Sequence, residues 1–329
     1  MKAVVVSKAG GPEVLEVREI AKPQVKTGWS LVKIKGFGIN HSEIFTRQGL
    51  SPSVVFPRIL GIELVGVIEE TTEPDRLPVG QKVVSIMGEL GRAFDGGYAE
   101  YALVPNQILY PVQTDLGWAE LASVPETYYT AYGSMKNLKL EASDRILVRA
   151  GASGVGQAFV KLVRSQFPDL PIYASVRKLE KMDQLLASGF SQVILEKEGR
   201  LQTELTFSKI LELVGPATLV DSLAHLAEGG IVCSTGQLGG KWYLEDFDPI
   251  EQLRQNVYLT TFYSGNVNQG KLQEMFDYLA RYQVPVGPEK IFSLDTIQEA
   301  HRYLEGAEAF GKVIVLNREE DDDRIETAE

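Results

Sequence analysis

One segment of the chain has the residue types and spacing of a phosphate-binding turn, Ala150-Gly151-Ala152-Ser153-Gly154-Val155-Gly156. Gly151 and Gly156 match the outer glycines of the G-x-G-x-x-G pattern, while Ser153 stands at the middle position. A strand pattern precedes the segment and a helical pattern follows it, so the N–H groups of a helix N-terminus would face a pyrophosphate. This context favours cofactor binding over a turn without a ligand, and the expected binding residues are Gly151, Ser153, Gly154, Val155 and Gly156.

The tip of the next predicted strand, about 20 residues further on, indicates which dinucleotide is bound. It has the sequence Ala174-Ser175-Val176-Arg177-Lys178, with no carboxylate before Glu180. NAD sites place an acid there for the ribose 2′-OH, whereas arginine and lysine pair with the 2′-phosphate of NADP. Two solvated bases at a helix start are the alternative, but bases are unfavourable there without an anion. We therefore expect NADPH, held by Ser175, Arg177 and Lys178.

The residues that bind transition metals are scarce. The chain has one cysteine, Cys233, and three scattered histidines, His41, His225 and His301. Neither a catalytic nor a structural zinc site can be built from them with ligand spacing, so no metal is expected. A single cysteine also forbids an intramolecular disulfide and fits a reducing compartment.

Composition and charge narrow the class of protein. The 329 residues are 44% hydrophobic and 23% charged, as in globular proteins of about two domains. The net charge is −11, of which the acidic run from Glu319 to Glu329 supplies −6 through seven acids and one arginine. The remainder has no basic excess, so no nucleic-acid partner is expected. We expect neither a signal peptide nor a membrane span, and hence a cytoplasmic protein with a solvated acidic tail.

Two different secondary-structure patterns in the sequence predict two kinds of domain. The first 120 residues carry short β-type runs between glycine and proline turns, which is typical of a barrel or sandwich. These runs are Ala3 to Val6, Leu31 to Lys35, Leu64 to Glu69, Lys82 to Ile86 and Tyr98 to Val104. From about Leu121, strand and helix patterns alternate, which predicts a doubly wound parallel sheet. Its six predicted strands are Arg145 to Arg149, Ile172 to Val176, Val193 to Leu195, Ile210 to Val214, Ile231 to Thr235 and Val257 to Phe262.

The last part of the chain does not extend the parallel sheet. Two helical segments follow Ser264, the second expected to open at Asp295 as N-cap with Gln298 three residues later. A final strand is predicted over Lys312 to Leu316, and these elements are expected to return to the first domain.

Taken together, these motifs resemble the medium-chain dehydrogenase/reductase superfamily, and within it the zinc-independent, zeta-crystallin-like quinone oxidoreductases. The resemblance runs from Met1 to about Leu316. The stretches that carry it include Gly38-Ile39-Asn40, Leu60-Gly61-Ile62-Glu63, Gly96-Gly97-Tyr98-Ala99-Glu100-Tyr101, Thr130-Ala131-Tyr132 and Gly311-Lys312-Val313-Ile314-Val315.

The resemblance implies a fold and its domain bounds. It implies an α/β protein in which a GroES-like β-barrel catalytic domain, 1–121 and 265–318, surrounds a doubly wound Rossmann domain, 122–264, that binds NADPH. The active site would lie in the cleft between the two domains. Residues 319–329 form the acidic tail. The family often pairs through its Rossmann sheets, so a homodimer is expected.

Family positions also imply roles for single residues. Asn40 and Thr127 match positions near the nicotinamide and the substrate, although Asn40 could instead satisfy a turn and Thr127 a helix start. Ser51 stands where relatives have a cleft tyrosine. Tyr128, Tyr129 and Tyr263 are the candidate substitutes, and of these we name Tyr128 as catalytic. Gly236, Phe262 and Lys312 match residues at the cofactor. At the zinc positions of metal-dependent relatives stand Asn40 and Ile62, and Glu63 remains from that set.

Without a Lewis acid to acidify an alcohol, reduction of an electrophilic acceptor is favoured over alcohol oxidation. The first expectation is hydride transfer from NADPH to a quinone. The second is reduction of a conjugated enone, as in an enoyl or alkenal reductase. A third, of another class, is an NADPH-binding protein with little turnover.

Overall fold

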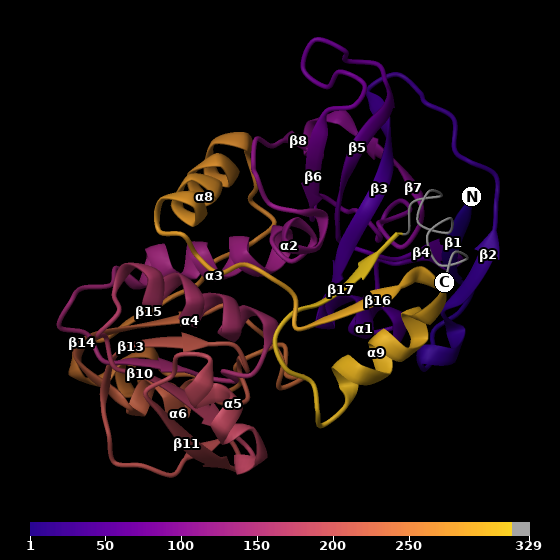
Figure 1. Ribbon diagram of the computed structural model, residues 1–329. Coiled ribbons are helices and arrows are strands. Elements are labelled where there is room, and N and C mark those ends of the chain that lie inside the picture. Colours follow the sequence, from indigo (N-terminus) through magenta and orange to yellow (C-terminus); the bar gives the residue numbers. More distant parts are fainter. Residues whose placement is uncertain (318–329) are drawn as a thin grey trace, which may run out of the picture. The chain divides into compact units, whose positions relative to one another are not determined.

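The computed structural model describes residues 1–317, which form two compact units (Figure 1). Unit 1 contains Met1–Glu126, Gly265–Phe276 and residues 286–317, and unit 2 contains Thr127–Ser264 and Asp277–Pro285. The first boundary between the units falls after residue 126, five residues later in the chain than the predicted boundary at 121/122. A short segment after Phe276 also belongs to unit 2. The predicted acidic tail lies outside the described residues.

Unit 1 is built from two sheets whose strands are mostly antiparallel. The smaller sheet has the order β2-β1-β4, and the larger has the order β16-β17-β3-β5-β6-β8, with β7 also paired to β3. The strands are β1 (Lys2–Val6), β2 (Glu16–Glu19), β3 (Trp29–Ile39), β4 (Arg58–Ile59), β5 (Glu63–Thr71), β6 (Lys82–Ile86), β7 (Tyr101–Pro105), β8 (Tyr110–Pro111), β16 (Lys290–Ser293) and β17 (Val313–Leu316).

Successive side chains of a strand point to opposite faces of the sheet, and in β1 and parts of β3 successive side chains are both buried, so both faces are covered there. In β1, Ala3, Val4 and Val6 are buried, and in β3 the buried set includes Val32, Ile34 and Phe37. The helices of this unit are α1 (His41–Arg47), α2 (Trp118–Ala122) and α9 (Ile297–Glu305), together with the first parts of α3 (Pro125–Leu138) and α8 (Gln269–Arg281).

The C-terminal segment returns to unit 1, as the sequence predicts. Strand β17 pairs antiparallel with β3, so that Val313 lies opposite Ile39 and Val315 opposite Phe37. The predicted N-cap at Asp295 is wrong. Thr296 is the N-cap of α9, and Asp295 lies inside the 3-10 turn Leu294–Thr296 that precedes the helix. That turn is capped by Ser293, whose backbone N–H donates to the Thr296 hydroxyl at 3.1 Å.

Unit 2 is a doubly wound sheet, as predicted. Its order is β12-β11-β10-β9-β13-β14-β15, and the six strands from β11 to β15 pair in parallel. The strands are β9 (Ile146–Val148), β10 (Ile172–Val176), β11 (Gln192–Lys197), β12 (Arg200–Leu201), β13 (Phe207–Glu212), β14 (Leu226–Ser234) and β15 (Tyr258–Thr260). The helices are the main part of α3, then α4 (Gly154–Gln166), α5 (Met182–Ala187), α6 (Leu219–Ala224) and α7 (Pro249–Gln252).

The strand order of unit 2 fixes where a ligand binds. The chain starts at β9, winds outward through β10 to β11, then crosses back to β13 on the other side of β9. In such sheets the ligand crevice lies outside the carboxyl ends of the strands, at the point where the winding reverses. The glycine-rich turn follows β9 at that edge.

Among residues 1–317, no helix is long and apolar enough to cross a membrane.

Helix α3 contains a glycine that is required by a neighbouring ring. A Cβ atom at Gly133 would lie 2.0 Å from Cε2 of Phe262, which is far inside van der Waals contact. Alanine in place of glycine usually stabilises a helix by up to about 1 kcal/mol. Here we expect Gly133→Ala to lower the free energy of unfolding by about 1–3 kcal/mol, because the ring must move.

Urea unfolding of both variants checks this expectation. The matched control is Gly270→Ala in α8, where the new Cβ would lie 3.5 Å from Asn268 Oδ1, an ordinary contact. This control should keep or gain stability. A Gly133→Ala protein as stable as the control would show that Phe262 does not pack against α3 in this way.

Candidate active site

In unit 1 a buried ammonium group lies between a carboxylate and an amide. Lys312 Nζ is 2.6 Å from Glu63 Oε1 and 2.7 Å from Asn40 Oδ1, and Asn40 Nδ2 donates to the same Glu63 oxygen at 2.8 Å. Glu63 is fully buried and Lys312 is 5% exposed. The bonds fix the Asn40 amide with its carbonyl toward the lysine and its NH₂ toward the glutamate. Because an ammonium has three donors, one lysine proton remains for a ligand.

The other oxygen of Glu63 holds the start of a helix. Glu63 Oε2 accepts the backbone N–H of Glu126 at 2.7 Å, in the first turn of α3. A carboxylate at a helix N-terminus satisfies an unpaired N–H group and interacts favourably with the helix dipole. Glu63 therefore positions the turn that begins the segment containing Thr127 and Tyr128.

Asn40 is also the N-cap of helix α1. The alternative role expected for it, satisfying the backbone of a turn, is therefore present in addition to its bonds to Glu63 and Lys312. The backbone N–H of Asn40 donates to Oε2 of Glu43, the third residue of the helix, at 3.2 Å. Glu43 is buried and also accepts the backbone N–H of Ile62 at 3.1 Å. Burial, and secondarily the charge of Glu63, raises the pKa of Glu43 to about 7. Glu43 was not among the predicted site residues, although an acid three residues after Asn40 has capping-box spacing.

Thr127 and Tyr128 lie in the first turns of α3, and both are buried. Burial raises the pKa of the Tyr128 phenol, so this group stays protonated near neutral pH and can serve as a hydrogen-bond donor. Phe262 lies two residues after the end of β15. Its ring packs edge-on against that of Tyr129, with ring centroids 5.4 Å apart.

The glycine-rich turn has the geometry of a helix start open to an anion. Ser153 is the N-cap of α4, and its Oγ accepts the N–H of Gly156 at 3.2 Å. A Cβ at Gly156 would lie 2.8 Å from the carbonyl oxygen of Gly151, and a Cβ at Gly151 would lie 2.6 Å from Ala174 Cβ. These glycines are therefore needed for close packing of turn and sheet, and the remaining N–H groups of the first helical turn suit a pyrophosphate. The residues present fit a dinucleotide.

The tip of β10 separates into a buried and an exposed part. Ser175 is 1% exposed and donates its hydroxyl proton to Glu196 Oε2 at 3.1 Å. Arg177 and Lys178 are exposed beyond the strand end. Burial, and secondarily the charge of Arg177, lowers the pKa of Lys181, so Arg177 and Lys181 lie close enough to repel each other. An anion bound at Arg177 would relieve this repulsion.

Gly236 lies at the end of β14 against the end of β13. A Cβ there would lie 2.2 Å from the carbonyl oxygen of Leu213, and its own carbonyl oxygen lies close to Gly215. The structure thus brings the glycine turn, Ser175 and Gly236 to the carboxyl ends of strands in unit 2, and Asn40 and Lys312 together in unit 1.

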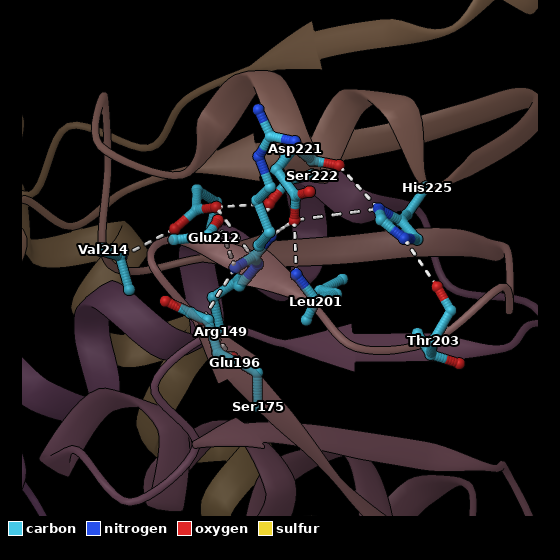
Figure 2. Close-up of polar contacts among 12 residues, drawn as sticks. Arg149, Ser175, Glu196, Leu201, Thr203, Glu212, Val214, Asp221, Ser222 and His225 are labelled. Carbon is cyan, nitrogen blue, oxygen red and sulfur yellow. Dashed lines mark hydrogen bonds and ion pairs between the residues drawn. The ribbon is translucent and has the colours of Figure 1, made fainter. Parts of the chain in front are cut away.

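Beneath this edge of unit 2 lies a buried ionic network that the sequence analysis missed (Figure 2). Arg149, the residue after β9, pairs with Glu196 at 2.7 Å and with Asp221 of α6. Its Nε donates to Ser222 Oγ at 3.1 Å, and Ser222 donates to Glu212 Oε2 at 2.5 Å. Burial raises the pKa of Glu212. An arginine directly before the glycine turn and acids ending two parallel strands were the available signal, since such ends converge at one edge.

Two family models match different parts of the sequence. The alcohol dehydrogenase GroES-like domain matches residues 26–114, and the zinc-binding dehydrogenase model matches residues 188–315. Human quinone oxidoreductase is 27% identical over 336 residues, which cover 96% of this chain and 98% of the relative. The chain belongs to the medium-chain dehydrogenase/reductase superfamily. The predicted fold class, a GroES-like barrel with a Rossmann domain, is thereby confirmed.

Solved structures of this superfamily agree with the fold. A mycobacterial protein solved in complex with NADPH is 25% identical, with a TM-score of 0.81 over 96% of this chain and 99% of that one. A Bacillus subtilis protein, yhfP, solved with NAD bound, is 23% identical, with a TM-score of 0.83 over 96% of this chain and 98% of that one. The chain is an oxidoreductase of the superfamily.

One family model is named for zinc, but the residues present do not fit that ion. Of the family positions, Asn40 and Ile62 supply no thiolate or imidazole, and Glu63 already pairs with the Lys312 ammonium. No cluster of three or more histidines, cysteines or acids suited to a metal occurs among residues 1–317. A cation is present at Glu63, but it is an ammonium group from the returning C-terminal segment.

The raised pKa of Glu43 gives unit 1 a distinct pH dependence. Between its ordinary pKa of 4.5 and about 7, native Glu43 keeps a proton that the unfolded chain has lost. Its contribution to stability therefore falls as the pH rises through this range, by about 3 kcal/mol in total. We expect Glu43→Gln to remove this part of the slope.

Urea unfolding at several pH values across this range measures the slope directly. The control is Glu70→Gln at the exposed end of β5, which should keep the wild-type pH dependence. Equal slopes for wild type and Glu43→Gln would mean that Glu43 is ionised in the folded protein.

Proposed function

We propose that this protein transfers hydride from NADPH to a quinone. The observation that carries the cofactor assignment is the pair of exposed bases, Arg177 and Lys178, at the tip of β10, beside a helix N-terminus built to bind a pyrophosphate. The similarity to human quinone oxidoreductase, over nearly the whole of both chains, supports the acceptor.

A nicotinamide cofactor is supported by the relatives solved with NADPH and with NAD. Since both forms occur among them, the choice depends on this chain's own residues. The residues that would hold NADPH are Gly151, Ser153, Gly154, Val155, Gly156, Ser175, Arg177, Lys178, Gly236, Phe262 and Lys312. When bound, the cofactor supplies the hydride, and the protein supplies binding and orientation.

Four polar groups of this chain are assigned roles toward the substrate or nicotinamide. Asn40 is held by Glu63 and Lys312, so its amide is pre-oriented before any ligand binds. Lys312 adds a positive charge and one remaining N–H donor for an oxygen that gains negative charge. Thr127 and the protonated phenol of Tyr128 are the candidate donors from α3. These roles stay predictions, as do the cytoplasmic location and the absence of a nucleic-acid or membrane partner.

The proposed homodimer also stays a prediction. Strand β15 is an edge of the parallel sheet, and two of its side chains, Tyr258 and Leu259, are exposed. An edge strand with exposed apolar side chains is a surface on which a second copy can pair.

Steady-state kinetics with matched acceptors test the reaction. The purified protein should oxidise NADPH with a 1,4-quinone at a higher kcat/KM than with a 2-alkenal of similar size. A higher value for the alkenal would favour the enone reductase. NADPH binding without oxidation by any acceptor of a broad panel would favour a binding protein.

A double variant tests the preference for NADPH over NADH. We expect Arg177→Ser/Lys178→Ser to weaken NADPH binding roughly 10- to 100-fold, because two charge-assisted hydrogen bonds to the 2′-phosphate are lost, and to leave NADH binding nearly unchanged. The control is Lys139→Asn, an exposed base after α3 at a positive φ that asparagine tolerates. Equal weakening of NADPH and NADH would remove these two residues from the 2′-phosphate site.

A further inference from the structure

Arg149 is fully buried, and its guanidinium joins four segments of unit 2 (Figure 2). Nη1 donates to Glu196 Oε2 at 2.7 Å and to the carbonyl of Gly199 at 3.4 Å. Nε donates to Ser222 at 3.1 Å, Nη2 donates to Asp221, and Glu212 Oε2 lies 3.9 Å from Nε. One cation thus faces three carboxylates at the carboxyl edge of the sheet.

This network reaches the strand tip that selects the cofactor. Glu196 Oε2 accepts both the Arg149 guanidinium and the hydroxyl of Ser175, so the carboxylate lies directly behind the tip of β10. Glu196 is 7% exposed, and its neighbour Ser175 is 1% exposed. Few water molecules can screen its charge there, so the charge acts at longer range than on the surface.

The hydroxyl of Ser175 adds a directional constraint. A serine hydroxyl has one proton, and that proton is donated to Glu196. Ser175 is therefore left as an acceptor, which suits a ribose 2′-OH better than a phosphate oxygen. Binding of the 2′-phosphate then depends on the exposed bases and on how far the negative charge of Glu196 is cancelled.

We propose that Arg149 determines cofactor selectivity from a buried position, by neutralising Glu196 behind Ser175 so that the tip of β10 accepts a 2′-phosphate. The inference rests on the proposed use of NADPH and deepens it. Arg149 is a positioning residue, since it acts through Glu196 and Ser175. Without Arg149, Glu196 would carry an uncompensated negative charge behind Ser175, one strand away from the tip position where NAD-specific sheets place their acid.

A set of charge variants tests this. The measurement is the ratio of the dissociation constants of NAD⁺ and NADP⁺ by isothermal titration calorimetry on the full chain. Because loosening of the domain weakens both cofactors alike, a purely structural role leaves the ratio unchanged. We expect Arg149→Gln to lower the preference for NADP⁺ about tenfold and Glu196→Gln to raise it several-fold, as expected for unit charges near a phosphate.

The double variant Arg149→Gln/Glu196→Gln is the decisive member, because it restores charge balance behind Ser175. Its ratio should return to within about threefold of the wild type. The matched control is Asp221→Asn, which removes another acid partner of Arg149, on α6, without touching Ser175. Its effect on the ratio should be smaller than that of Glu196→Gln.

The outcomes separate this inference from the proposed function. Should Arg149→Gln fail to fold, the Glu196→Gln and Asp221→Asn proteins still decide, since the first must shift the ratio more than the second. An unchanged ratio in Glu196→Gln overturns the inference, whatever the wild-type preference. A wild type that binds both cofactors equally contradicts the NADPH assignment, while a shift in the variants still supports the role of Arg149 and Glu196.

Discussion

A charge that is buried must be compensated, and Glu63 imposes this requirement on unit 1. Its carboxylate has no exposure, and its two oxygens accept Lys312, Asn40 and the first turn of α3. Removing one member of such a pair leaves an uncompensated charge, which is strongly destabilising. The end of β3, the start of β5, the start of α3 and the returning C-terminal segment are therefore held together by one group. The same bonds orient the amide that we assign to the substrate side.

Unit 2 meets the same requirement with Arg149. Arg149 follows β9 and immediately precedes the glycine turn. Its partners lie near the end of β11 or on α6. Parallel strands bring their carboxyl ends to one edge, so charged residues placed there in sequence meet in space. The network anchors that edge, and we propose that it also sets the charge next to the cofactor ribose. Stability and selectivity thus depend on the same buried side chains.

Much of the fold could be predicted because its pattern is local. The alternation of strand and helix after Leu121 and the glycine turn at Gly151 specify a doubly wound sheet without reference to the rest of the chain. The strands that were missed, β2, β4, β8, β12 and β16, have two to four residues each, too few for a periodic pattern. The cap of α9 was assigned to Asp295 because the intervening 3-10 turn, Leu294–Thr296, has no distinct sequence pattern.

The sequence alone determined the two domain types, the phosphate-binding turn, the basic tip of β10 and the lack of zinc ligands, because each depends on residue types close together in the chain. It did not determine which buried charges meet. Glu63 and Lys312 are 249 positions apart, and Arg149 and Asp221 are 72 apart. Their pairing depends on the register of β17 against β3 and on the packing of α6 at the sheet edge. Only the tertiary structure decides these, since no local rule relates residues that the fold alone brings into contact.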